Sequence, residues 1–213
     1  MSEHTLVLVP TRDEREGLGH IPGDMADVRV SGMGKVATAL AVSRAVLDGY
    51  ENVVLAGLCG GILGCSLGDL LIPSTVIDGD FDPGPAAQDR NRVMSATQQG
   101  AVEAQFVLTT SRNGRWATIV SQDQFAVQVR SSGHGFSGQV PLATDMESFA
   151  FVQSARFWKM PYAIVRVVSD IVGKNAGSDF ALLCRRFSPH LRDHVLAATE
   201  AIQEAKERKN VRP

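Results

Sequence analysis

Residues 52–61, with the sequence Asn-Val-Val-Leu-Ala-Gly-Leu-Cys-Gly-Gly, decide the fold class of this chain. Residues 52–56 form an apolar run of strand length, typical of a strand that is buried on both faces, as strands of parallel sheets are. The glycine-rich residues 57–61 follow at once and predict a turn at the end of that strand. A buried parallel strand requires neighbouring strands and covering helices elsewhere in the chain.

Segments on both sides of this run supply them. Apolar or β-branched runs predict strands at residues 5–10, 27–31, 70–77, 105–110, 116–120 and 162–168. Helical spacing of apolar residues predicts helices at residues 35–47 and 147–158. Ser188 followed by Pro189 is typical of a helix start, and we expect this last helix to run to about residue 208.

Strands that alternate with helices predict an α/β fold with a mixed, mostly parallel central sheet flanked by helices. The chain has 213 residues, 44% of them hydrophobic, which is enough for one well-buried core. No linker, repeat or low-complexity segment divides it, so we expect a single domain over residues 1–213. Residues 131–138 are predicted to form a loop, and residues 89–100 carry no predicted element.

Composition narrows the class of partner. The formal net charge is -2 and both signs are scattered, which disfavours nucleic acid and membranes. The first residues lack the pattern of a signal peptide, and no apolar run approaches the roughly 20 residues that span a bilayer. We therefore expect a soluble, cytoplasmic protein. The cysteines at positions 59, 65 and 184 match no zinc or redox spacing and are expected to be small buried hydrophobes.

Several strand ends carry residues suited to ligand binding, and in such sheets ligands bind beyond the carboxyl ends of strands. These segments are Gly32-Met33-Gly34, residues 57–61, residues 121–125 and Ser169-Asp170. We expect them to converge on one crevice. A dinucleotide-binding turn at residues 32–37 is disfavoured, because the next strand ends in Ala56-Gly57 where an acid for the ribose is needed. Glycines that permit a tight strand-to-helix turn explain this segment better.

The acidic and aromatic candidates each have a structural alternative. Glu147 could be a carboxylate favoured by a helix N-terminus. Asp170 ends an apolar strand, so its carboxyl needs a partner or a proton, although it could also cap the next segment. Glu14 lies in the charged run 12–16, which is typical of a solvated face. Phe125 could belong to the core.

The motifs taken together, in their order along the chain, resemble one family. They are Ser31-Gly32-Met33-Gly34-Lys35-Val36-Ala37, Gly57-Leu58-Cys59-Gly60-Gly61, Leu67-Gly68-Asp69, Ser121-Gln122-Asp123-Gln124-Phe125, Asp145-Met146-Glu147 and Arg166-Val167-Val168-Ser169-Asp170. This set resembles the purine nucleoside phosphorylase superfamily, and specifically its hydrolytic branch, which includes the methylthioadenosine/S-adenosylhomocysteine nucleosidases and futalosine hydrolase. The most specific part is Met146-Glu147 followed by Ser169-Asp170 at a strand end.

The resemblance implies a role for each residue at the base. Asp170 would donate a proton to N7 of the leaving purine, and Ser169 would orient it. Phe125 would stack on the base. Such an acid works near neutral pH only if burial raises the pKa of Asp170.

The resemblance also implies the residues at the sugar and the nucleophile. Glu147 would accept hydrogen bonds from the 2′ and 3′ hydroxyls of the ribose, Met146 would pack against the sugar, and Gly60 would join the substrate-binding set. Glu14 would position and deprotonate the attacking water, with Glu16 as the alternative two residues further on.

Phosphorylases of this family resemble one another in an arginine just before the glycine turn and a serine within it. Leu55 and Leu58 stand at these positions, and leucine cannot bind a phosphate oxygen. Water is therefore favoured as the nucleophile. Leu58 also replaces a serine common in the nucleosidases, and residues 171–173 differ from their usual Ala-Asp, so the nucleoside itself stays open.

The sequence thus predicts an enzyme that hydrolyses the N-glycosidic bond of an adenosine-like or 5′-modified purine nucleoside. One alternative is a phosphate-dependent phosphorylase whose phosphate site uses Arg12 or Arg166, and another is a non-catalytic nucleoside-binding protein. The expected partner is a small-molecule nucleoside, without cofactor, metal, nucleic acid or membrane. Analogy to the family predicts a homo-oligomer, either a dimer or a hexamer.

Overall fold

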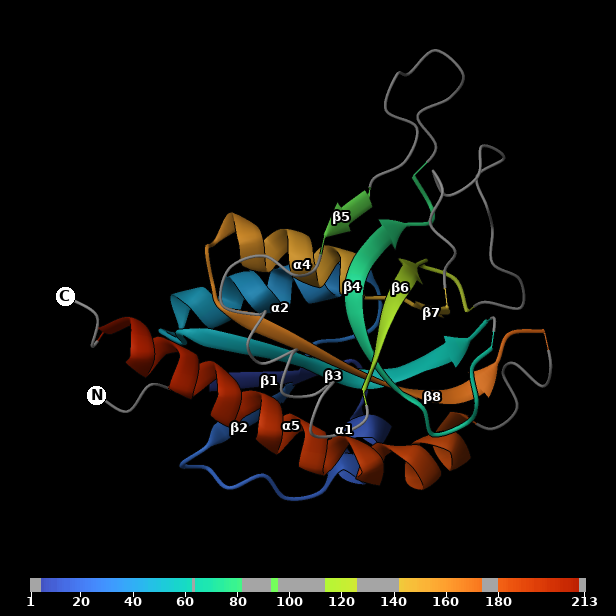
Figure 1. Ribbon diagram of the computed structural model, residues 1–213, viewed down its shortest axis with the longest axis horizontal. Coiled ribbons are helices and arrows are strands. Elements are labelled where there is room, and N and C mark those ends of the chain that lie inside the picture. The colour runs from blue at the N-terminus through green and yellow to red at the C-terminus, as the bar shows by residue number, and fades with distance from the viewer. Residues whose placement is uncertain are drawn as a thin grey trace, which may run out of the picture.

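The computed structural model describes residues 5–62, 64–81, 93–95, 114–125, 142–173 and 180–210. Within them one eight-stranded sheet is flanked by helices (Figure 1). In chain order the elements are β1 (Thr5–Val9), α1 (Arg12–Leu18), β2 (Ala26–Val30), α2 (Lys35–Leu47), β3 (Asn52–Gly61), β4 (Leu70–Asp78), β5 (Val93–Ser95), β6 (Arg115–Ser121), β7 (Ala143–Asp145), α4 (Ser148–Phe157), β8 (Tyr162–Ile171) and α5 (Phe180–Asn210).

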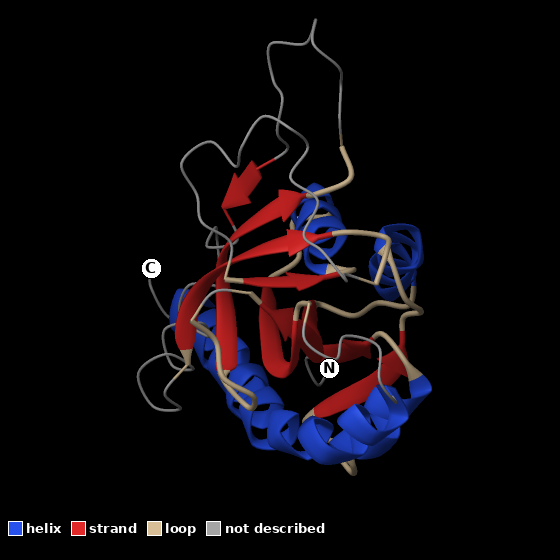
Figure 2. Ribbon diagram, turned by 90° about the vertical axis from the view of Figure 1, so that its right-hand side faces the viewer, coloured by secondary structure: helices blue, strands red, loops and turns tan. Residues whose placement is uncertain are grey.

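The sheet is mixed and mostly parallel, which confirms the predicted fold class. Strands β1 and β2, β1 and β3, β3 and β8, β4 and β6, and β6 and β7 pair in parallel. The pairs β3–β7, β4–β5 and β4–β8 are antiparallel. Because β8 joins β3 to β4 and β7 joins β3 to β6, five strands close into a ring, β3-β8-β4-β6-β7 (Figure 2).

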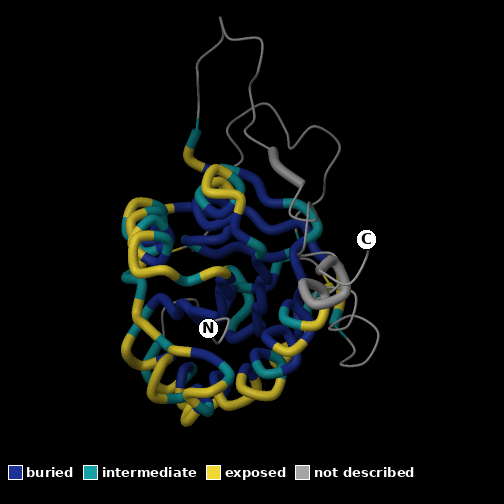
Figure 3. Tube along the Cα trace, turned by 90° about the vertical axis from the view of Figure 1, so that its left-hand side faces the viewer, coloured by how far each residue is buried: buried dark blue, intermediate teal, exposed yellow. Residues whose placement is uncertain are grey.

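Two hydrophobic clusters fill the space between the sheet and its helices. Helices α1 and α5 cover one face, where Val54 and Ala56 of β3 pack. Helices α2 and α4 cover the other face, where Val53 and Leu55 pack. The alternation follows from the two-residue period of a strand, and it explains why β3 is buried on both faces. Figure 3 shows the strands buried and the outer surfaces of the helices exposed.

The predicted turn at residues 57–61 is wrong, because β3 continues to Gly61. Pairing on both edges explains the extension: β8 pairs with β3 as far as Gly61, and β7 pairs with Gly60 and Gly61. The ladder between β3 and β8 shifts register, so that Cys59 faces Val168 and Gly60 faces Asp170. Both strands therefore run further toward the functional end of the sheet than local sequence indicates.

The predicted start of the last helix at Ser188-Pro189 is also wrong. Helix α5 begins at Phe180 and contains Pro189, although proline removes one backbone hydrogen bond of the helix. Helix α1 packs closely there, because a Cβ on Gly17 would lie 2.6 Å from Cβ of Ser188. This tertiary contact accompanies a helix that is continuous through the proline, and it overrides the local signal.

Other sequence-based expectations concern the short elements, the segments outside the described residues, and the cysteines. Strand β7 and helix α1 were not predicted, and β5 lies in the stretch left without an element. The strand expected at residues 105–110 and the loop expected at residues 131–138 lie outside the described residues. The cysteines are free, with Cys59 and Cys184 buried as expected and Cys65 only half-buried. No helix in the described ranges has the length and apolarity that crossing a membrane requires.

Candidate active site

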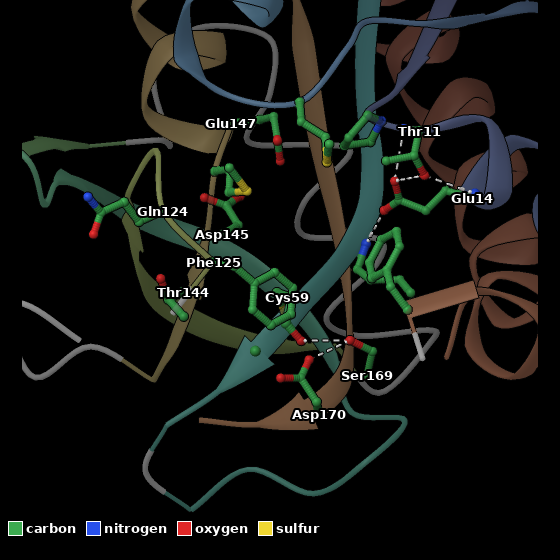
Figure 4. A pocket seen from close by; sticks show the side chains of 16 residues that line it. Thr11, Glu14, Cys59, Gln124, Phe125, Thr144, Asp145, Glu147, Ser169 and Asp170 are labelled. Atoms are coloured by element: carbon green, nitrogen blue, oxygen red, sulfur yellow. Dashed lines mark hydrogen bonds between the residues drawn. The ribbon is translucent and has the colours of Figure 1, made fainter. Parts of the chain in front are cut away.

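A cavity of about 400 Å³ opens where the strands of the ring end. All seven sequence-predicted site residues line it, namely Glu14, Gly60, Phe125, Met146, Glu147, Ser169 and Asp170 (Figure 4). They come from α1, β3, β8 and the segments that follow β6 and β7, so the expected convergence of strand ends is observed. The lining also includes residues without a predicted role: Pro10, Thr11, Met33, Leu58, Cys59, Gln124, Thr144, Asp145 and Phe180.

Glu14 is buried, with 2% of its surface exposed, so the expectation of a solvated face is wrong for this residue. Thr11 and Glu14 form a capping box at the start of α1, in which the Thr11 backbone N–H and hydroxyl donate to Oε2 at 3.0 and 2.8 Å. The Leu58 N–H donates to Oε1 at 2.8 Å. Burial raises the pKa of Glu14, while these donors and Arg166 oppose the rise.

The spacing of α1 also distinguishes Glu14 from Glu16. The two residues are about half a turn of helix apart, so Glu14 faces β3 while Glu16 is exposed, away from the lining of the cavity. The Thr11-to-Glu14 spacing is the sequence signature of a capping box, and it is the signal that could have revealed α1 in advance.

Glu147 precedes the first residue of α4, yet its side chain makes no capping hydrogen bond. Its carboxylate accepts from the Gly34 N–H at 2.9 Å and from Nη2 of Arg166 at 3.2 Å. Asp145 serves the helix end instead, because it accepts from the Ser148 N–H at 3.2 Å and from the Ser121 hydroxyl at 2.6 Å. The carboxylate that binds the N-terminus of α4 is therefore that of Asp145. Glu147 lines the cavity instead.

Arg166 lies beneath these carboxylates and is fully buried. Its Nη2 is 2.7 Å from Oδ2 of Asp145 and 3.2 Å from Oε2 of Glu147. Its Nη1 has no hydrogen-bond partner among the described residues. This atom lies beside Gly57, where an added Cβ would be 2.3 Å from Nη1 and 2.9 Å from Oε1 of Glu14. Only glycine fits at position 57, because any side chain would displace either the guanidinium or the carboxylate.

Burial raises the pKa of Glu147, and the coulombic attraction of Arg166 opposes the rise. The neighbouring Asp145 acts in the same direction as burial, since two nearby carboxylates disfavour each other's charge. The guanidinium supplies the positive charge that offsets part of the mutual repulsion of these buried acids.

Asp170 has a simpler environment at the end of β8. The Ser169 hydroxyl donates to Oδ1 of Asp170 at 2.8 Å and also lies 3.4 Å from the Cys59 carbonyl oxygen. Burial raises the pKa of Asp170, and the Ser169 hydrogen bond lowers it by less. Gly60 brings the backbone of β3 close, because a Cβ there would lie 3.6 Å from Oδ2 of Asp170.

Two apolar side chains at the cavity are much more exposed than core residues. Phe125 is 47% exposed and Met33 is 62% exposed, so the core interpretation of Phe125 is wrong. Phe180, the first described residue after residues 174–179, also lines the cavity. In the part of the chain that the structure describes, no group of three His, Cys, Asp or Glu is arranged to hold a metal ion.

Residues 12–204 match the family model described as the phosphorylase superfamily. The chain therefore belongs to this superfamily, and the family resemblance inferred from its motifs is confirmed.

Similar proteins of known name include nucleosidases. The 5′-methylthioadenosine/S-adenosylhomocysteine nucleosidase of a Geobacillus species is 23% identical, over 96% of this chain and 97% of its own length. The Staphylococcus carnosus nucleosidase of the same name is 28% identical over 76% of this chain and 75% of its own. These names agree with the enzyme class predicted from sequence, an N-glycosyl hydrolase.

Solved structures show the same fold. A Helicobacter pylori 5′-methylthioadenosine/S-adenosylhomocysteine nucleosidase, crystallised with a small-molecule ligand, has a TM-score of 0.78 at 17% identity, covering 93% of this chain and 98% of its own. Futalosine hydrolase of Helicobacter pylori also has a TM-score of 0.78 at 17% identity, covering 94% and 98%.

Proposed function

We propose that the protein is a purine nucleosidase, which uses water to cleave the N-glycosidic bond of an adenosine-like or 5′-modified nucleoside. One observation carries the proposal: Glu14, Glu147 and Asp170 line a single cavity in three different electrostatic environments. Pairs of carboxyl groups with opposed protonation needs are a recognised basis for acid and base catalysis.

Asp170 is the acid. Burial raises its pKa and so favours the protonated carboxyl more than in an ordinary aspartate. The proton passes to N7 of the purine as the bond between C1′ and N9 breaks. The bonding electron pair leaves with the base, which departs neutral because N7 is protonated. Ser169 fixes the carboxyl through its hydrogen bond to Oδ1.

Glu147 binds the ribose. Its carboxylate accepts hydrogen bonds from the 2′ and 3′ hydroxyls, while Gly34 and Arg166 fix its orientation from the other side. Loss of the base leaves oxocarbenium character on the sugar, as in glycoside hydrolysis generally. A carboxylate beside that sugar stabilises the developing positive charge more than it stabilises the ground state.

Glu14 positions the nucleophile. Three donors from Thr11 and Leu58 hold its carboxylate in one orientation, which is the preorganisation that a general base needs. A water beside it loses a proton to the carboxylate as its oxygen bonds to C1′. Arg166 contributes a further buried donor, Nη1, beside Gly57 on the same side of the site.

Water fits the site better than phosphate does. Leu55 packs in the core under α2 and α4, whereas Leu58 presents an apolar side chain to the cavity. Of the two arginines considered for phosphate, Arg12 is exposed and does not line the cavity. Arg166 is bound to Asp145 and Glu147, so a phosphate dianion would have to compete with two carboxylates for it.

The test of this function measures base and sugar products from adenosine and 5′-methylthioadenosine with and without added phosphate. We expect release of free base and free ribose or 5′-modified ribose at the same rate in phosphate-free buffer. Turnover that requires phosphate and yields a ribose 1-phosphate would support the phosphorylase alternative instead. Binding of both nucleosides without turnover would support the non-catalytic alternative.

We also propose that the protein acts as a homo-oligomer, a dimer or a hexamer. Helix α2 leaves Val36, Leu40 and Leu47 exposed, and Phe157 at the end of α4 is exposed as well. Exposed apolar patches of this kind mark contact surfaces on soluble proteins. Light scattering on the wild type and on Leu40→Glu tests this: we expect an oligomer that the charged side chain weakens, and a monomeric wild type would contradict the proposal.

A further inference from the structure

A cluster of four charged side chains lies beside the cavity and takes no part in the mechanism above. Lys35, the first residue of α2, places Nζ 2.7 Å from Oδ1 of Asp78, 2.8 Å from Oδ2 of Asp80 and 3.9 Å from Oδ2 of Asp123. Asp78 ends β4, Asp80 follows it, and Asp123 follows β6. The ammonium, with 16% of its side chain exposed, thus joins three separate segments, and we call this group the Lys35 cluster.

Backbone hydrogen bonds extend the Lys35 cluster into the loop after β6. The Lys35 N–H donates to Oδ1 of Asp123 at 2.8 Å, and the Asp123 N–H donates to Oδ2 of Asp80 at 2.6 Å. Asp123 is therefore held through both its side chain and its main chain. Gln124 and Phe125 follow it directly and line the cavity, so the cluster fixes the start of the segment that carries the proposed base-stacking ring.

The same peptide segment reaches Glu147. The N–H groups of Gly34 and Lys35 are consecutive, and they donate to the carboxylates of Glu147 and Asp123 at 2.9 and 2.8 Å. Gly34 has a φ of 89°, and a Cβ there would lie 2.9 Å from Oδ1 of Asp123. Glycine is required for this geometry, because other residues rarely adopt that φ and would meet the carboxylate.

The charges make the ammonium essential to the arrangement. Three carboxylates gathered around one site repel one another unless a cation lies between them. Burial lowers the pKa of Lys35, but the hydrogen bonds and the coulombic attraction of Asp78 and Asp80 together raise it by more, so the side chain stays charged at neutral pH. Removing the ammonium would leave the three carboxylates unneutralised and would push the segments after β4 and β6 apart from the start of α2.

We propose that Lys35 is a positioning residue for nucleoside binding: its ammonium holds the start of α2 against the β4 and β6 loops, so that the Gly34 N–H orients Glu147 and Phe125 stays at the cavity. Lys35 does not touch the substrate and acts through these two residues. The inference rests on the proposed nucleoside site.

The test uses equilibrium binding, which needs no turnover. Isothermal titration measures the affinity of a non-cleavable C-nucleoside analogue of adenosine and of its 2′-deoxy counterpart for the wild type, Lys35→Met, Lys35→Arg and the control Lys159→Met. Lys159 is exposed two residues after the end of α4, away from the cavity lining. We expect Lys35→Met to weaken the ribo analogue about tenfold or more, equivalent to about 1.4 kcal/mol, and the 2′-deoxy analogue clearly less.

The difference between the two analogues separates positioning from general damage, because only the ribo analogue offers both hydroxyls to Glu147. Lys35→Arg should restore part of the affinity, and Lys159→Met should bind like the wild type. Equal losses for both analogues, or no loss, would overturn the inference while leaving the nucleoside site intact. A wild type that binds neither analogue would overturn the proposed function and this inference with it.

Asp80→Asn provides a second variant if Lys35→Met does not fold. It removes one carboxylate charge while keeping an oxygen that can accept from the Asp123 N–H. We expect the same preferential loss of the ribo analogue, smaller in size, because the ammonium keeps Asp78 as a partner. An Asp80→Asn protein with unchanged ribo-to-deoxy preference, alongside a Lys35→Arg protein that also binds normally, would contradict the inference.

Discussion

The two ends of the cavity differ in the charged groups and hydrogen-bond donors that surround their carboxyl groups. At one end, which we call the arginine end, Glu14, Asp145 and Glu147 surround the buried guanidinium of Arg166 and accept several backbone N–H groups. At the other, the Asp170 end, a single carboxyl has the Ser169 hydroxyl as the one hydrogen-bond donor shown for it among the described residues. Burial acts at both ends, but among the residues that the structure describes, only the arginine end has a cation in contact with its carboxylates.

This difference shows how one cavity can hold an acid and a base made from the same functional group. A nearby cation and N–H donors favour the ionised carboxylate, whereas burial without a cation favours the protonated form. The arginine end is therefore suited to accept hydrogen bonds and protons, and the Asp170 end is suited to donate a proton. Each substitution predicted below changes one residue at one end of the cavity and so tests this difference.

Glu14→Gln should have the largest effect on activity. The amide keeps the size of the side chain but cannot take a proton from water, so base release should fall at least about 10³-fold, within the range of general base catalysis. Single-turnover measurement of base release checks this. Glu16→Gln is the matched control, since Glu16 is exposed, and it should be mild. A Glu14→Gln enzyme of near-normal rate would exclude the base role.

Arg166→Met should lower the free energy of unfolding of the protein, because it removes the cation of the arginine end. It leaves Asp145 and Glu147 buried without a cation, and breaking a buried ion pair from one side costs about 3–5 kcal/mol. Denaturant unfolding measures the loss, which should shrink as pH falls, because a protonated carboxyl needs no cation. Arg44→Met removes only an exposed ion pair and should cost about 1 kcal/mol or less. Equal losses in the two variants would contradict the contrast.

Asp170→Asn should lower base release by about a hundredfold or more, since the amide has no proton to donate to N7. Folding should be little affected. Because the pKa of Asp170 is raised, the proton persists to higher pH than on an ordinary aspartate, and the wild-type rate should fall as pH rises through that pKa. The pH profile of Asp170→Asn should lack this decline. An active variant with the wild-type profile would remove Asp170 from the mechanism.

Glu147→Gln should have the smallest and most selective effect. Hydrogen bonds to a charged group contribute about 1.5–3 kcal/mol, so ribonucleosides should lose about tenfold or more in kcat/KM. A 2′-deoxynucleoside cannot make the full pair of hydroxyl bonds and should lose less. Equal losses for the two substrates would mean that Glu147 is only a structural carboxylate near α4.

Sequence predicted the elements that carry strong local patterns and the residues that carry family motifs. The apolar run of β3 and the helical spacing of α2 belong to the first kind, and Met146-Glu147 with Ser169-Asp170 belong to the second. The buried setting of Glu14 was missed because it depends on α1 packing beside β3, a contact that a charged run does not reveal.

Long-range contacts account for the other differences. Strand β7 has three residues, too few for a periodic pattern, and it forms because β3 and β6 lie on either side of it. The continuation of α5 through Pro189 accompanies its contact with α1. The Lys35 cluster joins three segments that are distant in sequence, so no local window could contain it.

The register shift between β3 and β8 has a consequence for how the acid is built. Successive residues of a regular strand point to opposite faces, yet Ser169 and Asp170 both line the cavity. The shift accounts for this, because β8 holds one more residue than β3 between Val168 and Asp170, as in a β-bulge. The extra residue, Ser169, thus supplies the hydroxyl that donates to Oδ1 of Asp170, the proposed proton donor. Deleting Ser169 would leave a regular ladder in which Asp170 still pairs with Gly60, so the carboxyl would keep its place and lose the hydroxyl that orients it. The bulge therefore places two adjacent side chains on one face of the strand.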